Sequence, residues 1–161
     1  MMDVSRRAFL GSPAVLAMGR GQLSVACALE ESKTALAGLS PFNGEHESGR
    51  VIVESAVGFA EQDLEWLAGR GIALSPPVAV SGPAWIRFTW PVPALIRDFG
   101  RICRVTGGRA IAHLGGVPVA ARCRNLIVLG TPIGPLLYAG DQDAQRLLRG
   151  LIDRYDYGFF C

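Results

Sequence analysis

The chain has 161 residues, a length typical of one globular domain. Half of the residues are hydrophobic, and 20 glycines with 10 prolines favour short elements joined by many turns over a helical bundle. The formal net charge of +2 gives no reason to expect an obligatory nucleic-acid or anionic-membrane partner. No apolar stretch reaches the roughly 18 residues of a membrane-spanning helix, so we expect no transmembrane segment.

The first feature in chain order is a motif at residues 5–11. Its sequence, Ser-Arg-Arg-Ala-Phe-Leu-Gly, is followed by a mildly apolar segment and by the small residues Ala26-Cys27-Ala28. This arrangement resembles the twin-arginine export signal of bacteria. The resemblance implies that residues 1–28 are an export signal and that the protein is periplasmic or exported. The signal residues read by the export machinery would be Arg6, Arg7 and Phe9. The alternative is a basic N-terminal helix on a cytoplasmic protein.

The next segments predict a linker and the start of the folded body. Residues 29–49 are polar and rich in turn signals, so we expect a linker there and a single α/β domain over residues 50–161. The β-branched residues of Arg50–Val57 predict a strand. Ala60–Ala68 predicts a short helix, because its acidic residues favour the N-terminal half through the helix dipole.

The middle of the chain predicts a half-buried strand and an amphipathic helix. From Ala84 to Trp90, apolar residues alternate with residues that include Trp85 and Arg87. Ala94–Val105 then predicts a helix with four apolar residues facing inward, namely Leu95, Ile96, Phe99 and Ile102.

The second half of the chain predicts short strands followed by a helix. The strand candidates are Arg109–Leu114, Val117–Ala121, Asn125–Leu129 and Leu136–Ala139. Gly115-Gly116 suits a hairpin turn between the first two. Asp141 or Asp143 caps the last helix. Its inward residues fall at helical spacing: Ala144, Leu147, Leu148, Leu151 and Ile152.

This order of elements predicts an α/β or α+β fold: a two-layer sandwich with a mixed sheet and about three helices. Residues 130–140, which begin Gly-Thr-Pro, are similar to the second half of a thioredoxin-type domain, where a Thr-Pro pair precedes a central strand. The resemblance implies a thioredoxin-like body. The Cys-x-x-Cys motif of that family is absent, and Trp90 to Pro93 stands in its place.

Two cysteines are the candidate catalytic residues. Cys103 and Cys123 are each flanked by arginines, and nearby guanidinium groups favour the thiolate. The pair therefore suggests a reactive thiol or a redox couple, and a bridge between them is one possible connectivity among several. The alternative is that both are small apolar residues whose charged neighbours point elsewhere.

An arginine stripe is the candidate binding surface. Arg97, Arg101 and Arg104 fall at i, i+4 and i+7 on the expected helix, and Arg87 and Trp85 on the preceding strand extend the stripe. Guanidinium groups beside an aromatic platform form a minimal footprint for single-stranded nucleic acid or a phosphorylated ligand. The alternative is an ordinary solvated helix face.

The sequence predicts no metal and no cofactor. A zinc site needs three or four ligands, whereas His46 lies in a polar loop and His113 stands alone in an apolar strand as an expected core residue. Phosphate-loop, dinucleotide-binding and serine-hydrolase motifs are all missing from the sequence.

Three functions follow from these patterns. The first is an exported accessory or binding protein that is not an enzyme. The second is a cytoplasmic nucleic-acid-binding or nuclease-like protein that uses the arginine stripe. The third is a thiol redox protein that uses Cys103 or Cys123. The partner would be nucleic acid or another protein, and the sequence alone does not choose among the three.

Overall fold

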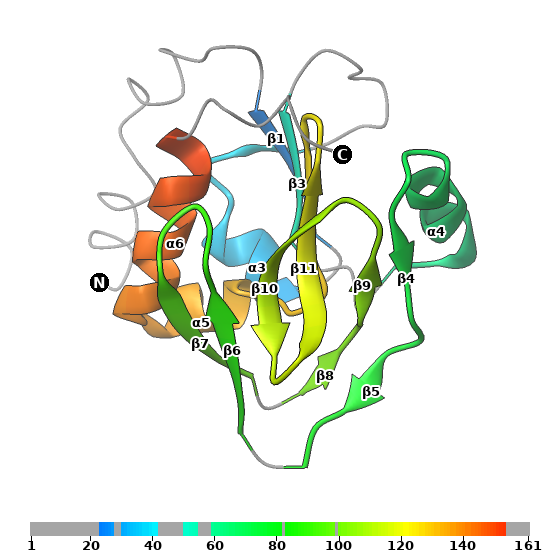
Figure 1. The fold of residues 1–161 in the computed structure, drawn as a ribbon. Helices are drawn as coiled ribbons and strands as arrows, with labels where there is room; N and C mark the ends of the chain where they lie inside the picture. The colour runs from blue at the N-terminus through cyan, green and yellow to red at the C-terminus, as the bar shows by residue number, and fades with distance from the viewer. Residues whose placement is uncertain are drawn as a thin grey trace.

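The computed structural model describes residues 23–27, 30–41, 50–54, 59–81, 83–98 and 100–153, which form a curled mixed sheet flanked by helices (Figure 1). The eight-stranded sheet has the order β2-β1-β3-β12-β11-β10-β6-β7. Its strands are β1 (Leu23–Ala26), β2 (Ser40–Pro41), β3 (Arg50–Val53), β6 (Ala84–Phe88), β7 (Ala94–Asp98), β10 (Arg109–Leu114), β11 (Val117–Cys123) and β12 (Leu126–Leu129).

Four helices and two small ribbons complete the described structure. The ribbons pair β4 (Ala73–Leu74) with β9 (Val105–Thr106) and β5 (Val78–Ala79) with β8 (Arg101–Ile102). The helices are α3 (Glu30–Ala35), α4 (Glu61–Ala68), α5 (Gly134–Ala139) and α6 (Gln142–Asp153). In the described ranges, none of the helices has both the length and the apolar character needed to cross a bilayer.

The sheet changes from parallel to antiparallel pairing at β12. β1 pairs in parallel with β2 and β3, and β3 pairs in parallel with β12. The remaining neighbours, from β12 through β11, β10 and β6 to β7, pair antiparallel. Gly115 takes a left-handed φ of 60° in the β10–β11 turn, which glycine adopts without steric cost. The mixed sheet with its helices confirms the general α/β or α+β prediction, and the β10–β11 hairpin confirms the predicted turn. The two-layer sandwich stays a prediction.

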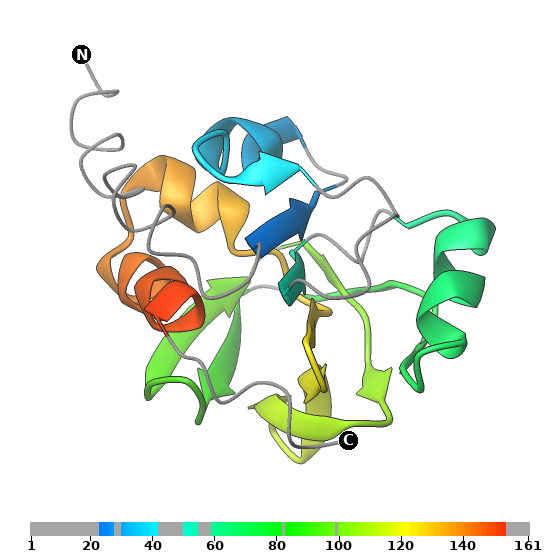
Figure 2. The ribbon, with the colours of Figure 1, turned by 90° about the horizontal axis from the view of Figure 1, so that it is seen from above.

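Each face of the sheet has its own hydrophobic core. The larger core lies under α3, α5 and α6, and the smaller one lies under α4 (Figure 2). β3 contributes side chains to both cores, because Ile52 faces the larger core while Val51 and Val53 face the smaller one. A strand buried on both faces is typical of the parallel part of an α/β sheet.

Several local predictions are confirmed. α4 forms where expected, and the Asp63 carboxylate accepts the N–H of Ala60 at its start. Asp141 caps α6, since its Oδ2 accepts the N–H of Ala144 at 2.9 Å. The five inward residues predicted for this helix are all buried.

The predicted helix over Ala94–Val105 is wrong, because this segment forms β7, β8 and β9. The apolar residues of this segment fit the two-residue alternation of a strand as well as the spacing of a helix. Ala94 and Ile96 are buried, whereas Leu95 is 39% exposed. β7 pairs along its full length with β6, and this backbone ladder would be lost if the segment were helical.

Two other assignments are corrected. Leu136–Ala139 belongs to α5 rather than to a strand, so the Thr131-Pro132 pair precedes a helix. The central strand that the thioredoxin resemblance implied after this pair is thus absent at this position. The thioredoxin-like arrangement of the whole domain stays a prediction. Residues 30–41, expected in a polar linker, form α3 and β2, and three of their side chains enter the larger core: Ala35, Leu36 and Leu39.

The start of the chain bears on the expected cleavage site. Residues 1–22 lie outside the described residues, so the twin-arginine resemblance stays a prediction. β1, however, lies between β2 and β3 in the sheet, and Val25 belongs to the larger core. Cleavage at Ala28 would remove this strand from the parallel half of the sheet.

We therefore expect a chain that begins at Leu29 to be less stable than one that begins at Leu23. Loss of the buried Val25 side chain alone costs about 2 kcal/mol, and β3 also loses its pairing with β1. Urea unfolding followed by circular dichroism measures the difference as a lower midpoint. Equal midpoints would contradict the placement of β1.

Candidate ligand-binding face

Part of the sheet carries side chains that no described helix covers. We call this surface the outward face, defined by Trp85 and Arg87 on β6, Leu95 and Arg97 on β7, and His113 on β10. α4 and the β4–β9 ribbon contribute to the core over β3, β11 and β12 on the second side of the sheet. Trp85 is 51% exposed, and Arg87 and Arg97 are exposed as well.

The alternating sequence of β6 positions two of these side chains. Ala84, Ile86 and Phe88 are buried on the side of the larger core, so the residues between them must point the other way. Trp85 lies opposite Arg97, and Arg87 lies opposite Leu95 in the β6–β7 ladder. The Arg97 guanidinium lies over the Trp85 ring, 5.4 Å from its centroid, which is within the range of a cation–π contact.

A β-bulge brings His113 to the same surface. Ala110 pairs with Ala121 and Ala112 pairs with Ala120, which leaves Ile111 as an extra residue in β10. Ile111 and Ala112 are consequently both buried in the larger core. Regular alternation from Ile111 would turn His113 toward that core, whereas the bulge places it opposite Arg87. The interpretation of His113 as a core residue is therefore corrected, because it is only partly buried.

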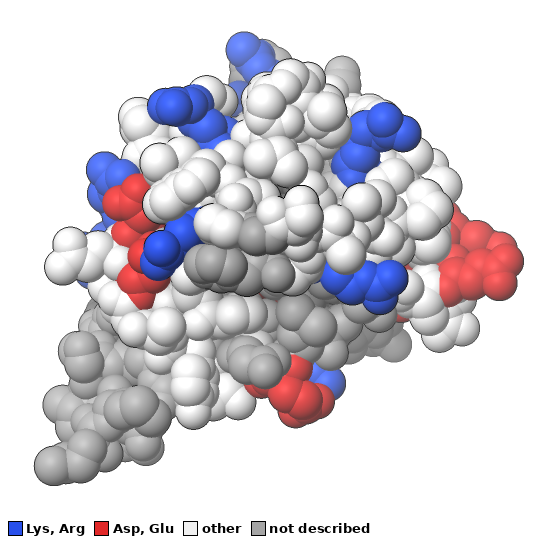
Figure 3. All heavy atoms as spheres, turned by 90° about the horizontal axis from the view of Figure 1, so that it is seen from below, with Lys and Arg blue, Asp and Glu red and all other residues white. Residues whose placement is uncertain are grey.

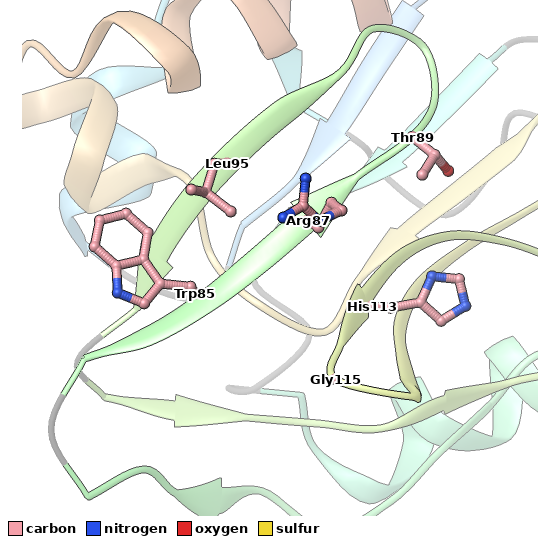
Figure 4. A pocket seen from close by; sticks show the side chains of 6 residues that line it. All are labelled: Trp85, Arg87, Thr89, Leu95, His113 and Gly115. Atoms are coloured by element: carbon pink, nitrogen blue, oxygen red, sulfur yellow. The ribbon is translucent and has the colours of Figure 1, made fainter.

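These side chains surround a shallow hollow of ≈ 540 Å³ (Figure 4). Trp85 and Leu95 lie at one end, His113 lies at the other, and Arg87 lies between them. Gly115 and Thr89 complete the lining. The Thr89 backbone N–H donates to the Ile111 carbonyl at 2.9 Å, which fixes the end of β6 against the bulge.

A second hollow of ≈ 410 Å³ adjoins the first and shares Arg87, Thr89 and Leu95 with it. Asp143 and Arg146 of α6 line its far side. Both carboxylate oxygens of Asp143 are engaged. Oδ2 accepts the N–H of Leu95 at 2.9 Å, and Oδ1 accepts a hydrogen bond from Arg146 at 3.2 Å. Asp143 thereby ties α6 to the edge strand β7.

The structure brings together only part of the predicted arginine stripe. Arg97 joins Trp85 and Arg87 on the outward face, as described above. Arg101 lies in β8, and the backbone N–H of Arg104, just before β9, donates to Ser75 Oγ, just after β4, at 2.8 Å. Viewed from below, acidic side chains form a patch at the right edge, where α4 lies, and others lie at the left among basic side chains and near the lower edge (Figure 3). The signal residues Arg6, Arg7 and Phe9 lie outside the described residues.

The cysteines do not form the predicted couple. Cys123 is disulfide-bonded while Cys27 and Cys103 are free, so a Cys103–Cys123 bridge is wrong. Burial raises the pKa of the Cys103 thiol, and the Arg101 guanidinium offsets this only in part. Burial also raises the pKa of Cys27 to about 12, and the neighbouring Glu54 carboxylate acts in the same direction. Both free thiols are therefore protonated near neutral pH.

Sequence reasoning missed a second polar cluster, at the carboxyl ends of β1 and β3. Glu54 is fully buried, and its Oε1 accepts the N–H groups of Ile133 and Gly134 at the start of α5. Ser32 Oγ is buried beside Gly134 without a hydrogen-bond partner. No local pattern could reveal this contact, because 79 and 80 residues separate Glu54 from its two donors.

The described part of the chain holds no group of three His, Cys, Asp or Glu side chains that could bind a metal ion. Comparison with known proteins gave no match to a family model, to a curated protein or to a solved structure. What the outward face could bind must therefore be inferred from its side chains alone. These are guanidinium groups, an exposed indole and an imidazole around a hollow.

We expect Cys27 and Cys103 to react slowly with iodoacetamide at pH 8 in the folded protein. The raised pKa values leave little thiolate at this pH, and the rate for Cys27 should keep rising toward pH 12. The stabilisation from the Cys27 thiol is complete below pH 9 and is lost as the pH rises toward 12. Peptide mass spectrometry reads the rates, and the same protein unfolded in urea is the control. Fast alkylation of either folded thiol at pH 7 would contradict this account.

Proposed function

We propose that the protein binds a phosphorylated ligand that carries a planar ring, of the nucleotide class, on its outward face. The observation that carries the proposal is the position of Arg87, which lines both hollows and has Trp85 and His113 on either side. This is the function of a binding protein, and it develops the nucleic-acid alternative that the sequence suggested.

The chemistry of the three side chains fits such a ligand. The planar guanidinium fork of Arg87 matches the oxygens of a phosphate group bidentately. An exposed indole stacks on a base, an interaction worth about 1–3 kcal/mol per base. The imidazole of His113 adds a further hydrogen-bonding group at the other end of the same hollow.

The charge distribution favours local recognition over long-range attraction. The net charge of the chain is +2, so a strong field around the whole molecule does not draw anions to it. The acidic residues of the first turn of α4 line neither hollow, whereas Asp143 lines the second one. Affinity must then come from direct contacts with Trp85, Arg87 and Arg97.

The proposed binding does not depend on the predictions of export, of a thioredoxin-like arrangement or of thiol redox chemistry. Export through the twin-arginine signal would place the same binding face outside the cytoplasm, and a thioredoxin-like arrangement of layers would not alter it. Thiol redox chemistry has less support, because burial raises the pKa values of both free thiols.

Substitution on the outward face should weaken binding of fluorescein-labelled single-stranded hexathymidine, measured by anisotropy. We expect Trp85→Ala to reduce affinity by about 5- to 150-fold, the equivalent of one lost base stack. Arg87→Glu should reduce it at least as much, because a guanidinium is replaced by a repelling carboxylate. The matched control is Arg101→Glu, an exposed arginine on β8 that lines neither hollow. A loss with Arg101→Glu equal to that with Arg87→Glu would place the site elsewhere. Failure of the unaltered chain to bind either hexathymidine or thymidine monophosphate would end the proposal.

A further inference from the structure

We infer that the outward face takes an extended single strand of nucleic acid rather than a mononucleotide, an inference that rests on the proposed function. The two hollows are contiguous, and they present separate guanidinium groups to a ligand. Arg87 lines both of them, whereas Arg146 lines only the second and Trp85 only the first. A ligand that contacts both Trp85 and Arg146 must therefore extend across the two hollows.

The lining residues are arranged across the strands, which favours a ligand that lies across the sheet. His113, Arg87 and Leu95 lie side by side on β10, β6 and β7. Beyond Leu95 the surface continues onto α6, because the N–H of Leu95 donates to Asp143 and Arg146 donates to the same carboxylate. With neighbouring strands about 4.8 Å apart, two steps of the sheet and one step to the helix cover on the order of 15 Å. The binding surface is therefore elongated.

The second hollow should bind a phosphate more weakly than the first. Arg146 is paired with Asp143, whose negative charge lies beside any anion that enters. The Asp143 carboxylate is held by Leu95 and Arg146, and it in turn orients the Arg146 guanidinium. Loss of Arg146 should consequently cost less affinity than loss of Arg87.

The exposed indole favours a single strand over a duplex. Base faces within a duplex are stacked on one another and cannot be reached by Trp85, whereas unstacked bases of a single strand can lie on the ring. Sequence preference should be modest, since stacking is tolerant of base identity.

The test compares thymidine monophosphate with single-stranded hexathymidine by isothermal titration calorimetry. We expect the hexamer to bind at least tenfold more tightly. Arg146→Ala should weaken hexamer binding several-fold and leave monophosphate binding unchanged, whereas Arg87→Ala should weaken both. Arg149→Ala, three residues further along α6 and outside both hollows, is the matched control. Thermal unfolding midpoints of the variants establish that each is folded.

The outcomes separate the inference from the proposed function. Equal affinity for both ligands, with no effect of Arg146→Ala, would overturn the inference while the nucleotide-binding function stands. Failure of both ligands to bind would overturn both. Tighter binding of a duplex of the same length would contradict the single strand. Equally tight binding of polyglutamate would indicate an acidic protein partner in place of nucleic acid.

Discussion

The position of Arg87 depends on the pairing of β6 with strands on both of its sides. β7 fixes Leu95 and Arg97 across from Arg87 and Trp85, and β10 fixes His113 on the other side of Arg87. Shifting either register by one residue would turn one row of side chains to the opposite face. The chemistry of the outward face is thus a consequence of backbone register rather than of any local motif.

The two faces of the sheet are stabilised differently, and this difference leaves a surface open to a ligand. One face is packed against α3, α5 and α6, and the buried Glu54 carboxylate joins β3 to the start of α5. The other face has a smaller core under α4. Side chains on β6 and β7 beyond that core are exposed, and they include an indole and two guanidinium groups. Asp143 satisfies a backbone N–H on the edge strand, which helps to protect that edge from pairing with another chain.

Local patterns predicted the elements whose signals lie within a few residues of one another. The period of α6, the alternation of β6 and the Gly115 turn are of this kind. The segment after Pro93 was misassigned because a short apolar run fits both helical and strand periods, and only the pairing with β6 decides between them. The placement of His113 depends on a bulge between two strands, and the start of α5 depends on a distant carboxylate. Neither the bulge nor the carboxylate contact can be predicted from the residues that are adjacent in sequence.

The central claim is that a nucleotide-class ligand lies on the outward face, and amide chemical shifts test it most directly. In a titration of the isotope-labelled full chain with hexathymidine, the account predicts that the largest shifts occur at Trp85, Arg87, Arg97 and His113. Amides near Glu54 and Leu67, on other surfaces of the sheet, should move little. Shifts concentrated around Cys27 and Glu54, or on α4, would contradict the claim.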